Sequence, residues 1–160
     1  KADAYALQRA QKAGVPVHVL IKKKEQDRRE YDAQLAELVL SCRPDWVILA
    51  GWMRLLSSAF LNHFPLRVVN LHPALPGTFP GVHAIERAYE AWQRNEIQHS
   101  GIMVHFVPDE GVDDGPLIAQ EVIPFIPGES LLAFEERVHK TEHRLLVDTL
   151  INLIKEKERI

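Results

Sequence analysis

The chain has 160 residues, of which 46% are apolar and 26% charged, with a formal net charge of −3. This length suits one domain with a single buried core, and the charge balance argues against a nucleic-acid-binding protein, whose contact surface is basic. No apolar run approaches the roughly 18 residues that a membrane-spanning helix needs. Cys42 is the only cysteine, so no disulfide can form within the chain, and we expect a reducing cytoplasm.

Hydrophobic periodicity predicts helices and strands that alternate along the chain. In chain order they are a helix that Gly14 ends, a strand over 15–21, a helix over 31–42, a strand over 45–51, a helix over 57–64, a strand over 67–72, a helix over 84–94, strands over 101–107 and 117–123, and one or two closing helices over 130–158. This alternation is typical of an α/β fold, and the run at 45–51 predicts a strand buried on both faces of a parallel sheet. The short loop between the last two strands allows them to pair antiparallel. Ser130 is suited to cap the closing helix.

Polar side chains gather where the predicted strands end, and in open α/β sheets ligands bind at the carboxyl ends of the strands. Asn70 and His72 are two positions apart on an extended chain, so both project to the same side. Asn supplies neutral amide donors, and His can donate when charged or carry a proton near neutral pH. A carboxylate from the acidic loop at 108–115 would favour the charged imidazolium. The pattern predicts a site that stabilises an oxyanion and handles a proton without a nucleophilic side chain.

Each of these features also has a plain structural interpretation. Asn before a loop is often a turn former, and a single His at a strand end is more often structural than catalytic. The run Asp-Asp-Gly-Pro at 113–116 is common turn chemistry. None of the eight His residues forms a close ligand pair on a helix with a third ligand near it, so we expect no metal site. Cys42, on an apolar helix face, is interpreted as a small core residue.

Three ordered motifs decide between these interpretations: NLHPALPGTFPG at 70–81, VHFV at 104–107 and GVDDGP at 111–116. Together they resemble the phosphoribosylglycinamide formyltransferases, a family of folate-dependent enzymes, and the likeness runs from Lys1 to about Leu150. Methionyl-tRNA formyltransferase and formyltetrahydrofolate deformylase share the Asn-x-His-Pro core, but FPGVHA at 79–84 is the purine-pathway pattern. The resemblance implies one formyltransferase domain over 1–160, with a three-layer, Rossmann-like α/β fold and a mostly parallel sheet with an antiparallel C-terminal part.

The resemblance also implies an activity, the transfer of a formyl group from 10-formyltetrahydrofolate to the amine of glycinamide ribonucleotide in purine synthesis. Asn70, His72 and Asp113 match the catalytic trio of the family. Asn70 and a protonated His72 would stabilise the tetrahedral oxyanion, and Asp113 would hold His72 charged; counting back from Gly115 leaves Asp114 as the alternative. The partners implied are these two small molecules, without metal, nucleic acid or membrane, in a monomer or homodimer.

The binding residues follow from the same resemblance. The segment at 53–56 matches the lining of the folate pocket, and the loop at 107–113 matches the one that closes over the pterin ring. Either Arg28 or Arg29, with a preference for Arg29, falls near the folate glutamate tail, and Glu142 is suited to contact ribose hydroxyls. The folate set is Arg29, Met53, Arg54, Leu55, Leu56, Val107, Pro108, Asp109, Glu110, Gly111, Val112 and Asp113, and the acceptor set is Asn70, His139, Lys140, Thr141 and Glu142.

One family feature does not occur in this sequence. The family begins with a strand and a Gly-Ser-rich loop whose backbone amides hold the acceptor phosphate, and no such loop is found here. The resemblance therefore implies a strand–loop–helix unit of roughly 30 to 40 residues ahead of Lys1. Two alternative functions stay open: a hydrolase of the same fold that gives the formyl group to water, and a non-catalytic folate- or nucleotide-binding module.

Overall fold

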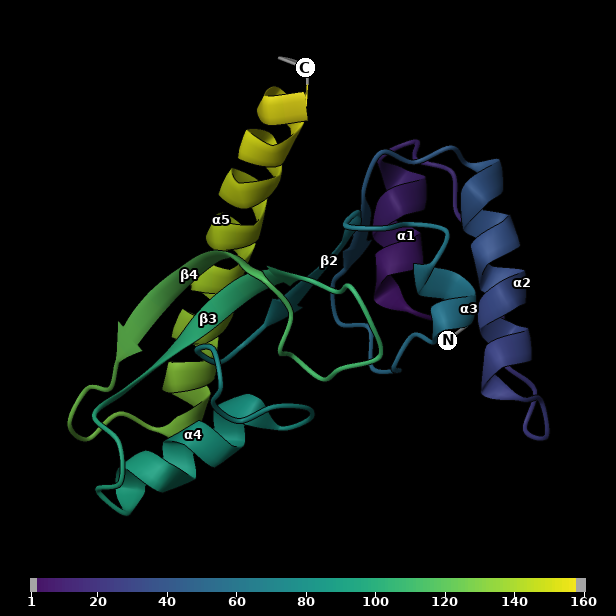
Figure 1. Ribbon diagram of the computed structural model, residues 1–160. Helices are drawn as coiled ribbons and strands as arrows, with labels where there is room; N and C mark the ends of the chain where they lie inside the picture. Colours follow the sequence, from purple (N-terminus) through teal and green to yellow (C-terminus); the bar gives the residue numbers. More distant parts are fainter. Residues whose placement is uncertain (1–2, 158–160) are drawn as a thin grey trace.

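The computed structural model describes residues 3–157 of the chain (Figure 1). Its helices and strands alternate, as the periodicity predicts. In chain order they are α1 (Tyr5–Lys12), α2 (Arg28–Ser41), β1 (Val47–Leu49), α3 (Ser58–Leu61), β2 (Val68–His72), α4 (Ala84–Gln93), β3 (His99–Phe106), β4 (Leu117–Pro124) and α5 (Leu131–Lys157). No helix in this part of the chain combines the length and the apolar character that crossing a membrane requires.

The four strands of the described chain form one open sheet in the order β1-β2-β3-β4. β1 and β2 run parallel, whereas β2 with β3 and β3 with β4 run antiparallel. The predicted α/β fold with an antiparallel C-terminal part is confirmed. The antiparallel share is larger than predicted within the described residues, because β3 already runs against β2 before the short loop reverses the chain into β4.

Helices cover both faces of this sheet. On one face, Val69 of β2 and Val104 of β3 pack with Leu153 of α5. On the other face, Val68 of β2 packs with residues of α2 and α3, among them Ala36 and Phe60. Neighbouring residues of a strand point to opposite faces, so this split places the sheet between α5 on one side and α2 with α3 on the other. Figure 1 shows α5 crossing β3 and β4 while α2 and α3 lie toward the β2 side of the molecule.

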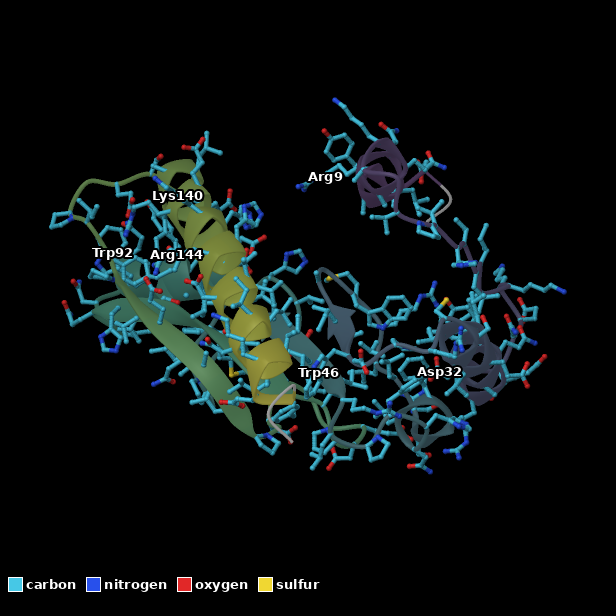
Figure 2. The ribbon with its side chains drawn as sticks, turned by 90° about the horizontal axis from the view of Figure 1, so that it is seen from above. Arg9, Asp32, Trp46, Trp92, Lys140 and Arg144 are labelled. Atoms are coloured by element: carbon cyan, nitrogen blue, oxygen red, sulfur yellow. The ribbon has the colours of Figure 1, made fainter. Side chains whose placement is uncertain are left out.

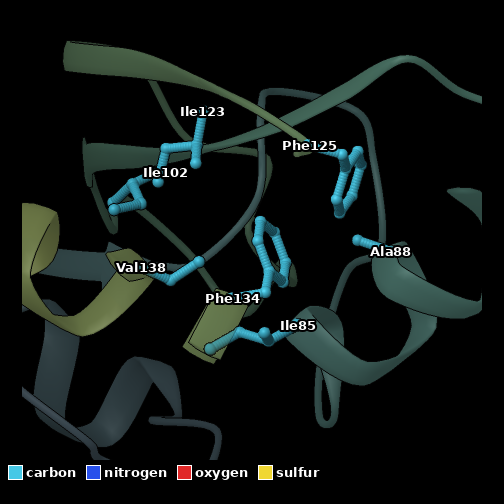
Figure 3. Packing of buried hydrophobic residues seen from close by; sticks show 7 residues of the cluster. All are labelled: Ile85, Ala88, Ile102, Ile123, Phe125, Phe134 and Val138. Atoms are coloured by element: carbon cyan, nitrogen blue, oxygen red, sulfur yellow. The ribbon is translucent and has the colours of Figure 1, made fainter. Parts of the chain in front are cut away.

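A separate cluster holds α4 against the start of α5. Phe134, which is fully buried, lies between Ile85 and Ala88 of α4 and the strand residues Ile102 and Ile123 (Figure 3). Ile85 and Ala88 are three positions apart and therefore lie on one helix face. The cluster fixes α4, and with it the end of the Pro- and Gly-rich loop that precedes this helix.

N-terminal caps fix the starts of two helices: the predicted start of α2 is corrected, and the predicted cap of α5 is confirmed. α2 begins at Arg28, a turn before the predicted start, because the Asp27 carboxylate accepts hydrogen bonds from the backbone N–H groups of Arg29 and Glu30. The closing segment is a single helix, and the N–H of Ala133 donates to the Ser130 hydroxyl at 3.3 Å, as expected for a cap.

Three other predictions are wrong. Residues 15–21 form no strand, and Val15 and Ile21 are exposed, since no described strand lies beside them to accept their backbone hydrogen bonds. Cys42 is exposed at the C-terminal cap of α2 instead of being a core residue. The strand predicted over 45–51 is shortened to β1 and is half-buried instead of buried on both faces, because β1 is the edge strand of the described sheet.

Candidate active site

The site is built on two neighbouring strands. Asn70 of β2 lies directly opposite His105 of β3, and His72 lies opposite Met103. These side chains share the sheet face that points away from α5, because the intervening Leu71 packs, like Val69, against the α5 side. The predicted placement of Asn70 and His72 on one side of the strand is therefore what the structure has.

Asp113 joins these side chains from the loop between β3 and β4. Its Oδ1 accepts a hydrogen bond from Asn70 Nδ2 at 3.0 Å, and its Oδ2 accepts one from the Gly81 N–H at 2.8 Å. The same Oδ2 lies 3.3 Å from His72 Nδ1. Asp113 has a left-handed backbone, with φ of 53°, a conformation that is uncommon outside Gly but that Asn and Asp adopt more readily than other side chains. Asp113, and not the exposed Asp114, is thus the carboxylate that reaches His72.

His72 is buried and has an acceptor at each ring nitrogen. Besides Asp113 at Nδ1, the Phe79 carbonyl lies 3.2 Å from Nε2. Burial lowers the pKa of His72 below its ordinary value; the Asp113 carboxylate and the Phe79 carbonyl oppose this shift without reversing it. At neutral pH the free protein therefore favours the neutral imidazole, although the flanking acceptors are ready to hold the charged form.

The Asp113 carboxyl is shifted toward its charged form. Burial alone would raise the pKa of Asp113, but the hydrogen bond from the Gly81 N–H and any charge on His72 lower it overall. The carboxylate is thus ionised at neutral pH and offers a fixed negative charge beside the His72 ring.

Arg87 of α4 holds the loop that carries Phe79. Its guanidinium donates to the carbonyls of Phe79 and Pro80, both at 2.6 Å, and lies 5.9 Å from the Phe79 ring centroid. Phe79 has a left-handed backbone with φ of 46°. Arg87 therefore fixes the carbonyl that meets His72. We did not predict it as a site residue, because only the fold brings α4 under this loop.

The other end of the acidic loop contacts α2. Glu110 forms ion pairs with Arg28 and, at 3.7 Å, with Arg29, and it accepts a hydrogen bond from the Ser58 N–H at 2.9 Å. Arg28, the alternative to the preferred Arg29, makes the closer contact. The structure thus brings both candidate arginines to the loop, but an internal carboxylate occupies them in the free protein.

The predicted folate segment at 53–56 lies in the loop between β1 and α3. Met53 and Leu55 are exposed, and the Arg54 guanidinium lies 5.6 Å from the Tyr31 ring centroid. Leu56 is buried among the core residues of the α2–α3 side, so its side chain contributes to the core. Within the predicted loop at 107–113, the Val107 N–H donates to the Val68 carbonyl, which ties the loop to β2.

The remaining loop residues hold its shape. The Asp109 carboxylate accepts from the Gly111 N–H at 2.8 Å, and Val112 is exposed, as is Pro108. A Cβ at Gly115 would lie 1.9 Å from the Phe106 carbonyl oxygen, so only Gly allows the loop to return to β3 this closely. Gly115 therefore closes the loop that carries Asp113, and any other residue at this position would force the backbone at Phe106 to move.

The predicted acceptor segment at 139–142 lies on α5. His139 Nδ1 lies 2.7 Å from the Glu142 carboxylate, and the Thr141 hydroxyl donates to the Arg137 carbonyl. Lys140 is exposed, and Figure 2 labels it on α5, far in that view from Asp32 of α2. In the described residues no hydrogen bond or ion pair links this segment to the trio at Asn70, His72 and Asp113.

Within residues 3–157, no three His, Cys, Asp or Glu side chains are grouped so that they could hold a metal ion. The chemical groups at the site are instead one amide, two imidazoles and one carboxylate, the set that donates hydrogen bonds to developing negative charge and moves protons. His105, the second imidazole, is a residue that we did not predict to be part of the site. Its position in the VHFV motif, as a polar residue within an apolar strand, was the available signal.

This open α/β sheet carries an amide, two imidazoles and a carboxylate at one site. The combination defines an enzyme that stabilises developing negative charge and moves protons. The formyl transferase family model matches residues 1–150, and the chain belongs to this family. The predicted family resemblance is thereby confirmed.

Within this family, the chain is similar to two relatives and one solved structure that bear the same name. The chain is 46% identical to phosphoribosylglycinamide formyltransferase of Schizosaccharomyces pombe, across 95% of this chain and 78% of the relative. It is 42% identical to the enzyme of the same name from Dictyostelium discoideum, across 94% and 79% of the two chains. The crystal structure of phosphoribosylglycinamide formyltransferase from Streptococcus pneumoniae superposes with a TM-score of 0.89 at 36% identity, over 96% of this chain and 83% of that one.

Proposed function

We propose that this protein transfers the formyl group of 10-formyltetrahydrofolate to the amine of glycinamide ribonucleotide, a step of purine biosynthesis, in the cytoplasm. The family, and relatives named for this reaction at 46% and 42% identity, support the assignment. The observation that carries it is the Asp113 carboxylate, which lies within 3.3 Å of both the Asn70 amide and the His72 ring.

In the proposed reaction, the acceptor amine attacks the formyl carbon and the carbonyl oxygen takes the negative charge. The new C–N bond forms first, and the bond from the formyl carbon to the folate nitrogen then breaks. The amine loses one proton, and the leaving folate nitrogen gains one, so the charges balance. The reaction calls for no metal ion and no covalent bond to the protein.

Asn70 and His72 would meet the oxyanion. Both hydrogens of Asn70 Nδ2 are engaged in the free protein, one with Asp113 and one with His105. An arriving oxyanion would replace Asp113 as the acceptor of one of them, since Asp113 keeps its bond from Gly81. A negative oxygen beside His72 would raise the pKa of its ring against the effect of burial, so His72 would take up a proton as the intermediate forms and pass it to the leaving nitrogen.

The binding residues form part of the same proposal. The backbone of segment 53–56 and the loop at 107–113 would hold the pterin ring, and Arg28 with Arg29 would meet the folate glutamate tail after releasing Glu110. The segment at 139–142 would contact the acceptor, with the Glu142 carboxylate on ribose hydroxyls. The ion pairs between Glu110 and the two arginines are partly exposed, so releasing the arginines would cost little free energy.

The test is a formyl-transfer assay on the full-length protein, with and without glycinamide ribonucleotide. We expect formylated acceptor and deformylated folate to appear together and only when the acceptor is present. Release of formate in the absence of acceptor would favour the hydrolase. Binding of the folate without either reaction would favour the non-catalytic module.

A further inference from the structure

His105 occupies the centre of the site without belonging to the predicted trio. Its side chain is 2% exposed, on the strand position directly opposite Asn70. The ring has three polar neighbours: the Phe106 carbonyl at 2.8 Å from Nδ1, Asn70 Nδ2 at 3.2 Å from Nε2, and Asp113 Oδ1 at 3.6 Å from Nε2. Because buried polar groups are normally hydrogen-bonded, each ring nitrogen of His105 should have a partner among these three neighbours.

The first two contacts define the tautomer of the ring. A backbone carbonyl can only accept, so Nδ1 of His105 carries the hydrogen that meets Phe106. An amide nitrogen can only donate, so Nε2 must be the bare, accepting nitrogen toward Asn70. The distance of 3.6 Å from Nε2 to Asp113 Oδ1 exceeds that of a hydrogen bond, so the hydrogen-bond partner of Nε2 is Asn70. One neutral tautomer satisfies both partners.

The Phe106 carbonyl is itself held in place, which fixes the ring. The pairing of β3 with β4 shifts register between Val104 and His105, and the Phe106 N–H donates to the Pro116 carbonyl at 2.9 Å. The Phe106 carbonyl oxygen packs so closely against Gly115 that no Cβ fits there. The irregular strand end therefore presents a rigid acceptor to Nδ1, and through it sets the direction of Nε2.

We propose that His105 is a positioning residue that keeps the Asn70 amide turned with its nitrogen toward the reacting oxygen. A flipped amide would place its oxygen against the bare Nε2 of His105, so two acceptors would face each other. Asp113 opposes the flip as well, but it also binds Gly81 and contacts His72, and in the proposed reaction the oxyanion takes its place on Asn70. From that moment His105 is the side chain that continues to accept from the Asn70 amide and so holds its orientation toward the oxyanion.

This role rests on the proposed function for its effect on turnover, and it predicts a specific set of variants. His105→Leu removes the acceptor and should lower kcat roughly tenfold or more, with the KM for the folate donor changed by less than about twofold. His105→Gln, whose side-chain oxygen reaches the place of Nε2, should keep kcat within about threefold of the natural protein. Val104→Ala, at the next position but facing α5, is the matched control for lost packing and should keep kcat within about twofold.

A double substitution separates positioning from plain structural support. If His105 acts only through Asn70, adding His105→Leu to Asn70→Ala should lower kcat by less than about twofold further. A full tenfold loss in that background would overturn the proposal, as would near-normal kcat in folded His105→Leu. The same holds if His105→Gln folds normally but is as impaired as His105→Leu.

An NMR measurement tests the tautomer without using activity. With ¹⁵N-labelled histidine in the full-length protein, the His105 ring should give one protonated and one bare nitrogen at neutral pH, with the proton on Nδ1. The bare Nε2 signal should shift in Asn70→Ala and stay in place in Val104→Ala. A proton on Nε2, or no shift in Asn70→Ala, would overturn the positioning role even if the His105 variants fail to fold. If Asn70→Ala keeps normal turnover while the Nε2 signal shifts, the catalytic role proposed for Asn70 fails and the contact between the two side chains stands; if the natural protein transfers no formyl group, the proposed function fails instead.

Discussion

From Val69 to His72, the two faces of β2 carry opposite kinds of side chain. On the α5 side, Val69 is fully buried and Leu71 half-buried among apolar residues. On the other side, Asn70 and His72 are held by the polar groups of the acidic loop and of β3. The polar face also has left-handed residues on its flanking loops, at Phe79 and Asp113. The comparison indicates that the last four residues of this strand have two roles that alternate along the chain. Val69 and Leu71 stabilise the fold, whereas Asn70 and His72 are polar groups positioned at some cost in burial.

The largest effects are expected on the polar face. Asn70→Ala and His72→Ala should each lower kcat roughly 100- to 1000-fold, as is usual when a donor to an oxyanion is removed. Binding of the folate donor should change little, because neither side chain belongs to its predicted pocket. Steady-state kinetics and equilibrium folate binding, each on the full-length protein, measure the two quantities. Near-normal turnover in either variant would contradict the roles proposed for this face.

Asp113→Asn is expected to have the next largest effect. Asn tolerates the left-handed backbone at this position, so the loop should keep its shape while losing its charge. The loss of the carboxylate lowers the pKa of His72 further and should reduce kcat roughly 10- to 100-fold. Asp114→Asn, one position along and exposed, is the matched control, with turnover expected within about twofold. Equal losses in the two variants would mean that the geometry at Asp113 is not what matters.

Val69→Ala tests the apolar face of the same strand. Removing two buried methyl groups from the cluster with α5 should lower the free energy of unfolding by about 2 kcal/mol. Turnover at a temperature well below the unfolding midpoint should stay within about twofold, since the amide and imidazole next to it keep their partners. Urea denaturation followed by circular dichroism gives the first quantity. A large fall in kcat without a loss of stability would break the division between the two faces.

The smallest effect is a pH dependence of stability at His72. Burial lowers the pKa of folded His72 below the ordinary value of 6.5, so below that pH the unfolded chain binds a proton that the folded protein does not. Stability from this position is therefore present above pH 6.5 and is lost as the pH falls toward the folded pKa. The pKa of Asp113, lowered from 3.8, acts in a separate and more acidic range. Urea midpoints measured across this range should fall less steeply in His72→Gln than in the natural protein; equal slopes would contradict the burial effect.

Much of the fold could be predicted from periodicity alone. The strands that become β2, β3 and β4 and the helices that become α2, α4 and α5 carry apolar residues at the spacing of their own geometry, so local sequence is sufficient to mark them. The predicted strand over 15–21 has the same β-branched character and is nevertheless irregular. A strand is completed by hydrogen bonds to a neighbour, and that neighbour is a property of the whole sheet.

The site, like the fold, has features that the local sequence determines and others that only the tertiary structure determines. The shared side of Asn70 and His72 is determined by the sequence, because a period of two residues is built into any extended chain. Only the tertiary structure decided that Asp113 and not Asp114 meets His72, since the answer depends on how the loop turns at Gly115. It also decided that His105 faces Asn70, because that contact depends on the register between two strands 35 positions apart in the chain. Local sequence determines which way a side chain points, and the packing of distant segments determines what it meets.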